Sequence, residues 1–146
     1  MSATNAFETS LLGLIFTNVD AANVGDATGL RGSTTAGSFY VSLHTASPGE
    51  TGDQTTNETA YGSYARQAIA RSTAGWTVSG ATVDNDNQIN FIEATSGPST
   101  ITHFGLGSAS TTAGNLFFHG ANAGSLVVNT GVQPYIAVGA LDVSLD

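Results

Sequence analysis

Hydrophobic positions near the N-terminus recur at the three- and four-residue spacing of an α-helix. The pattern predicts a short helix from Asn5 to about Thr17, with Asn5 as its N-cap and Glu8 completing a capping-box signal. Its apolar stripe, widened by Leu12 and Phe16, consists of Phe7, Leu11, Leu14 and Ile15. This stripe packs either against the chain's own sheet or against a neighbouring subunit, and the sequence leaves both alternatives open.

From residue 38 onward the pattern changes to short apolar runs separated by Gly, Ser, Asn and Thr, which is typical of strands and turns. In one run Ile89 and Phe91 alternate with Asn90, as on a half-buried strand. The spacing of about ten residues favours a mainly β fold, an antiparallel β-sandwich or jelly roll with one short N-terminal helix. The expected strands are Phe39–His44, Tyr64–Ser72, Gly75–Ser79, Gln88–Glu93, Ile101–Leu106, Asn115–Gly120, Ser125–Asn129, Tyr135–Val138 and Leu141–Leu145.

Two polar stretches interrupt the apolar pattern. The first, residues 18–37, connects the helix to the strands, so we expect residues 1–37 to form the helix and a connecting arm. Residues 38–146 then form a single β domain with a long polar loop at 46–62. Because this loop is too polar to have its own core, we expect contacts with neighbouring subunits to order it, through Glu50, Asp53 and Glu58.

Charge narrows the classes of partner. Charged residues make up 10% of the chain, against about 25% in typical soluble domains. Lysine is absent, the basic residues are Arg31, Arg66 and Arg71, and the net charge is −8. Such a chain cannot neutralise phosphates, which argues against nucleic acid and anionic membranes as partners. We expect Arg66 and Arg71 each to pair with a carboxylate, within the chain or across an interface.

The sequence shows no convincing catalytic, cofactor or metal motif. Three histidines, His44, His103 and His119, stand alone on separate predicted strands, where a hydrogen bond to a backbone carbonyl is the ordinary use of the ring. The run 84–87, Asp-Asn-Asp-Asn, fails the pattern of a calcium loop and is interpreted as a turn. Trp76 is expected in the core, with a carbohydrate-stacking platform at Trp76 or Tyr135 as the alternative.

Four segments resemble small virion proteins of tailed bacteriophages. They are Phe39-Tyr40-Val41-Ser42-Leu43-His44-Thr45-Ala46-Ser47-Pro48-Gly49-Glu50-Thr51-Gly52, the stretch Tyr61–Trp76, Thr102-His103-Phe104-Gly105-Leu106-Gly107, and Gly114-Asn115-Leu116-Phe117-Phe118-His119-Gly120. Relatives of this kind are often labelled tail-fibre proteins. The resemblance implies a structural protein of the virion, with no catalytic residues to carry over.

Within the virion we expect a capsid decoration (cement) protein on the outer capsid surface. Its partners would be the major capsid protein and copies of itself, as a homotrimer by analogy with such proteins. Expected interaction residues are Phe7, Leu11, Leu14, Ile15, Glu50, Asp53, Glu58, Arg66 and Arg71. The chain has no heptads or fibrous repeat, which favours decoration over the alternative, a tail or tail-fibre component with a receptor- or carbohydrate-binding role.

Overall fold

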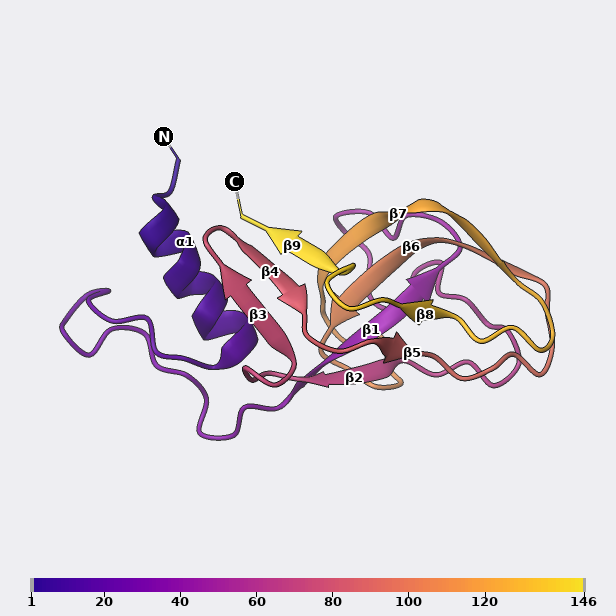
Figure 1. The fold of residues 1–146 in the computed structure, drawn as a ribbon, viewed down its shortest axis with the longest axis horizontal. Helices are drawn as coiled ribbons and strands as arrows, with labels where there is room; N and C mark the ends of the chain where they lie inside the picture. Colours follow the sequence, from indigo (N-terminus) through magenta and orange to yellow (C-terminus); the bar gives the residue numbers. More distant parts are fainter. Residues whose placement is uncertain (1, 146) are drawn as a thin grey trace. The chain divides into compact units, whose positions relative to one another are not determined.

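A computed structural model describes residues 2–145 and shows a mainly antiparallel β fold (Figure 1). Within that range there is one α-helix, α1 (Asn5–Leu12), continued by a π-helical turn, η1 (Gly13–Thr17). The predicted fold class, a sandwich-like β protein with one short N-terminal helix, is confirmed. The strands are β1 (Ser38–His44), β2 (Gln67–Ala70), β3 (Trp76–Ser79), β4 (Thr82–Asn85), β5 (Ile89–Asn90), β6 (Ser99–Gly107), β7 (Leu116–Val128), β8 (Tyr135–Ile136) and β9 (Asp142–Ser144).

The chain forms two compact units, each assembled from segments distant in sequence. Unit 1 contains the residues up to Ser38, Ala70–Gln88 and the residues from Ile136 on. Unit 2 contains Phe39–Ile69 and Ile89–Tyr135. This division differs from the expected separation of residues 1–37 from the rest, because β3, β4 and β9 belong to the same unit as the helix.

Unit 1 packs the helix on the antiparallel sheet β3-β4-β9. The buried helical residues are Glu8, Leu12 and Phe16, and the Phe16 ring meets Trp76 edge-on at 4.9 Å between centroids. The predicted stripe is therefore not the most buried face: Phe7 is 45% exposed. Leu11, Leu14 and Ile15 are half-buried. At 3.6 residues per turn, Leu12 and Phe16 lie beside that stripe, and it is Phe16 that faces the large Trp76 ring.

Two local predictions in unit 1 are wrong. Thr4, not Asn5, is the N-cap, and its backbone oxygen rather than a side chain accepts hydrogen bonds from the first turn. The expected turn at 84–87 begins later, because Asp84 and Asn85 belong to β4. Asn85 is 1% exposed and its amide donates to the carbonyls of Asn87 and Ala137, while its Oδ1 accepts from Leu141 N. Tertiary partners thus hold this polar residue in a strand.

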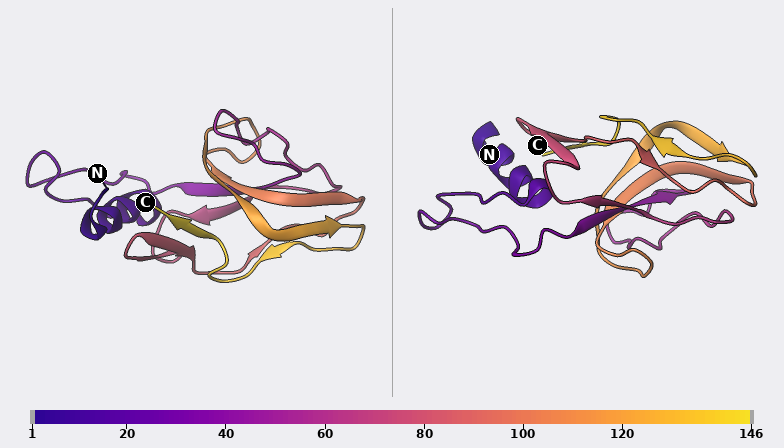
Figure 2. Two further views of the ribbon diagram at one scale, coloured as in Figure 1. Left: turned by 90° about the horizontal axis from the view of Figure 1, so that it is seen from above. Right: turned by 60° about the horizontal axis from the view of Figure 1, so that its bottom comes forward.

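Unit 2 is built around the sheet with strand order β2-β1-β6-β7, in which β1 and β6 are central. Figure 2 shows β6 and β7 side by side. The expected strands 115–120 and 125–129 are one long strand, β7, with a register shift where Ala121 pairs with His103 and Leu126 with Ile101. Ser42 and His44 on one face of β1 and Val41 and Leu43 on the other are all buried, so this strand is covered on both faces.

Candidate functional site

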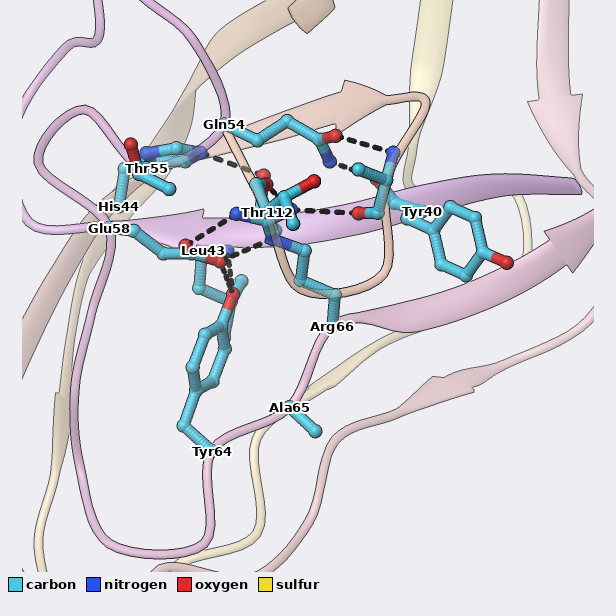
Figure 3. A network of polar contacts seen from close by, with 12 residues as sticks. Tyr40, Leu43, His44, Gln54, Thr55, Glu58, Tyr64, Ala65, Arg66 and Thr112 are labelled. Carbon is cyan, nitrogen blue, oxygen red and sulfur yellow. Dashed lines mark hydrogen bonds and ion pairs between the residues drawn. The ribbon is translucent and has the colours of Figure 1, made fainter. Parts of the chain in front are cut away.

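The polar loop 46–62 meets the end of β1 and the segment before β2 in a buried polar cluster (Figure 3). Glu58 of the loop accepts two parallel hydrogen bonds from Arg66, Nε to Oε1 and Nη2 to Oε2, each 2.7 Å long. The Arg66 side chain is 2% exposed and that of Glu58 is 15% exposed. Arg66 Nη1 also donates to the carbonyls of Ala109 and Thr112, at 2.7 Å each. Two parallel charge-assisted hydrogen bonds of this kind hold the two side chains together strongly and also fix their relative orientation.

Tyr64 joins the Glu58–Arg66 pair to the central strand. Its hydroxyl donates to Glu58 Oε1 at 2.8 Å and accepts from the backbone N–H of Leu43 at 3.0 Å. Burial raises the pKa of Tyr64, and the neighbouring Glu58 carboxylate raises it further, so the phenol keeps its proton. Tyr64 therefore acts as a donor to Glu58 throughout the physiological range.

Gln54 holds the middle of the loop and is fully buried. Its Oε1 accepts from Ala109 N at 2.8 Å and its Nε2 donates to the Tyr40 carbonyl at 3.2 Å. The side chain lies directly against Gly107, where any Cβ would collide with it. One buried amide thus forms hydrogen bonds with backbone groups of two other segments.

His44 shares the same buried region. Its Nδ1 lies 2.9 Å from the Thr56 carbonyl, which can only accept, so we assign the proton to Nδ1. Its Nε2, 2.8 Å from Ser42 Oγ, then accepts from that hydroxyl. The expectation of a carbonyl-bonded strand histidine is confirmed for His44, whereas His103 Nδ1 lies 2.8 Å from the Thr102 hydroxyl. The side chains of Ser42 and His44 are both fully buried against Gly105, where a Cβ would stand 2.7 Å from the His44 Nε2 atom. No substrate can reach this Ser–His pair, which ties the loop to β1.

These contacts order the loop without a neighbouring subunit. Asp53 accepts hydrogen bonds from the Thr55 hydroxyl and from the backbone N–H groups of Thr55 and Thr56, which hold its pKa below the usual range. Glu58 is committed to Arg66, so of the three acidic loop residues Glu50 is the one directed outward, with a side chain 96% exposed and 3.4 Å from His119. Contact of Glu50, Asp53 or Glu58 with another subunit stays a prediction.

Arg71, the other arginine expected at an interface, lies in unit 1. Its Nε donates to the carbonyl of Ile15 at 2.6 Å and its Nη2 to that of Leu14 at 2.9 Å. Its Nη1 donates to the carbonyl of Ala36 at 2.8 Å. Cations at helix C-termini satisfy carbonyl groups that have no partner within the helix. Arg71 therefore joins the end of the helical segment to the connecting arm.

The surface carries few candidates for ligand chemistry. Trp76 is 1% exposed, which confirms it as a core residue and removes it as a carbohydrate platform, whereas Tyr135 is 61% exposed. Across residues 2–145 no group of three or more His, Asp or Glu side chains is placed to hold a metal ion. None of the helical segments in this range is long and apolar enough to cross a membrane.

Acidification should destabilise the fold through His44. Burial is the main cause that lowers the pKa of His44 below 6.5. Below pH 6.5 the unfolded chain therefore takes up a proton that the folded chain refuses, at a cost of up to about 1.4 kcal/mol per pH unit until the folded pKa is reached. Above pH 6.5 the His44 ring is neutral in both states, so the free energy of unfolding is not reduced there.

Urea unfolding between about pH 7.5 and pH 5 measures this slope. The lowered pKa values of Asp20, Asp26 and Asp53 act below 3.8 and so outside this window. In His44→Asn, the amide nitrogen can still donate to the Thr56 carbonyl, but the titrating group is gone. A slope that persists unchanged in this variant would show that other groups cause it.

Sequence reasoning singled out Glu58 and Arg66 but missed Gln54 and Tyr64 as members of the cluster. Tyr64 stands in the Tyr-Ala-Arg segment that carries the resemblance, which was a usable signal. Gln54 stands among Thr, Asp and Asn, and nothing in that composition distinguishes a buried amide from an exposed one.

Comparison with known proteins assigns the chain to a phage family. A search of curated proteins finds no match. The model of one protein family, described as podophage GP4 fiber I protein gp80, matches residues 2–144. This match spans the helix, the polar loop and the strands of both units, and it confirms the resemblance to small virion proteins of phages. The chain belongs to the podophage GP4 fiber I protein family and is a structural protein of a phage virion.

Proposed function

We propose that the chain is a fibre component on the outside of a podophage virion, with no catalytic activity. The observation that carries this proposal is the family match over residues 2–144, because the family's description names a fibre protein. The buried cluster supports a structural role, since its polar groups satisfy one another and hold loop to sheet. The family's description thus favours the fibre alternative over capsid decoration.

A receptor- or carbohydrate-binding role belongs to this proposal and rests on Tyr135. This residue begins β8 and is 61% exposed, whereas Trp76 is buried. Tyrosine is enriched at binding interfaces because its ring is apolar while its hydroxyl can form hydrogen bonds. Tyr135 is thus the residue through which such a fibre would contact a glycan.

Capsid decoration is the second candidate, favoured by the outward side chains of two interaction residues from the sequence. Phe7 of α1 is 45% exposed, and the Glu50 side chain in the polar loop is 96% exposed. Both are available to a capsid shell. In this alternative the chain binds the major capsid protein on the outer head surface as a homotrimer.

Copy number in purified virions distinguishes the two candidates. We expect quantitative mass spectrometry to find a small number of copies relative to the major capsid protein, as for a fibre. Antibody labelling in the electron microscope should then mark discrete appendages. A copy number comparable to that of the major capsid protein, with label over the whole head, would contradict the fibre proposal and support decoration.

A further inference from the structure

The longest strand of unit 2 forms one edge of its sheet. β7 spans Leu116–Val128 and pairs on one side with β6, in a sheet whose order places β7 outermost. An edge strand presents backbone N–H and C=O groups that can pair with another chain, and monomeric proteins usually protect such edges with charges or proline. β7 contains no Asp, Glu, Lys, Arg or Pro. Its edge is therefore unprotected by the usual side chains.

β7 also exposes apolar side chains. Phe117 is 48% exposed, Leu126 39% and Val127 48%. The run Ala123–Val127 is exposed at every position, so both faces of the strand are accessible there. The register shift between Ala121 and Leu126 places the extra residues of β7 in this run. A bulge often blocks pairing at an edge, so Leu126 and Val127, where pairing with β6 resumes, are the centre of the accessible surface.

Charge identifies the occupant of this surface. The chain has a net charge of −8, yet it carries no Asp, Glu, Lys or Arg anywhere in residues 94–141, the segment that forms β6, β7 and β8. Two acidic copies repel each other least where neither presents a carboxylate. Glu50 lies beside His119 of β7, seven or more residues before Leu126 and Val127 along the strand. A second copy fits this neutral strand, whereas a basic partner would find no carboxylates on it.

We propose that the outer strand β7, centred on Leu126 and Val127, is the surface through which this chain associates with a second copy of itself. The opposite edge of the sheet, β2, is flanked by Arg66 and Arg71, which are committed to contacts within the chain. The inference deepens the proposed function, because a fibre built from a small module requires several copies. Self-association is measured on the isolated chain, whereas the fibre proposal is tested by the copy number in virions. A failure of one can therefore be distinguished from a failure of the other.

The test compares the full chain with Val127→Lys by light scattering coupled to size exclusion, over a wide range of concentration. We expect the unmodified chain to exceed its monomer mass of 14.7 kDa, and Val127→Lys to weaken self-association by about tenfold or more. The matched control is Val138→Lys, the same change at a valine that is 62% exposed in unit 1. It should associate like the unmodified chain.

Ser125→Lys provides a second variant at an exposed polar position of β7, so that misfolding of Val127→Lys does not decide the result. Circular dichroism checks that each variant is folded. Hydrogen exchange should show concentration-dependent protection of β7 amides and not of β3 or β4 amides. A chain that is monomeric at all concentrations, or one in which Val127→Lys and Val138→Lys behave alike, would overturn the proposal.

Discussion

Replacing Arg66 with methionine is expected to lower the free energy of unfolding by about 3–5 kcal/mol, the usual effect of breaking a buried ion pair by removing one partner. Methionine fills most of the volume but donates no hydrogen bond. The Glu58 carboxylate, 15% exposed, would keep only the Tyr64 hydroxyl among its present side-chain donors. The carbonyls of Ala109 and Thr112 would lose the Arg66 donor as well.

Arg31→Met is the matched control for this experiment. Arg31 also pairs with a carboxylate, Asp20, at 2.9 Å, but the two side chains are 67% and 43% exposed. Exposed ion pairs contribute about 0–1 kcal/mol, so urea unfolding at neutral pH should show a small change in this variant. Equal losses in Arg66→Met and Arg31→Met would show that the buried pair contributes nothing beyond a surface pair.

A double variant separates the charge from the packing. In Arg66→Met with Glu58→Gln, no buried carboxylate is left without its cation. We therefore expect the combined loss to be smaller than the sum of the two single losses, because the residues share one interaction. Additive losses would mean that Glu58 and Arg66 stabilise the fold independently, contrary to the bidentate geometry.

The sequence predicted β1 correctly because its apolar residues face the chain's own core. β1 carries Phe39, Val41 and Leu43, all buried, and its position was evident from that pattern. β4 was missed because Asp84 and Asn85 have turn-forming character in sequence, and their strand conformation depends on distant partners such as Ala137 and Leu141. The strand and turn propensities of Asp84 and Asn85 do not depend on these distant partners, so they cannot predict the strand.

The candidate cluster shows the same limit. A scarcity of cations made it reasonable to expect Arg66 to pair with a carboxylate, but eleven carboxylates were available and the sequence did not favour Glu58. The loop 46–62 has too little apolar surface to predict its order. Its order comes from single polar contacts, chiefly those of Gln54 with Ala109, just after β6, and of Glu58 with Arg66, just before β2. Such contacts exist only after the sheet has formed.

Replacing Phe16 with alanine is expected to destabilise unit 1 by about 3–5 kcal/mol, the range for deleting a buried aromatic ring. Phe16 is fully buried and lies edge-on against Trp76, the single tryptophan of the chain. The cavity left behind would be next to that indole. Tryptophan emission should therefore shift in the folded variant, and its transition in urea should move to lower denaturant.

Phe7→Ala is the control, since Phe7 lies on the same helical segment but is 45% exposed. Surface substitutions usually change stability by about 0.5 kcal/mol or less, so this variant should unfold almost like the unmodified chain. If Phe7→Ala cost as much as Phe16→Ala, the stripe Phe7, Leu11, Leu14 and Ile15 would be the face that anchors the helix. A small loss leaves Phe7 free to serve, as the sequence suggested, in contact with another subunit of the virion.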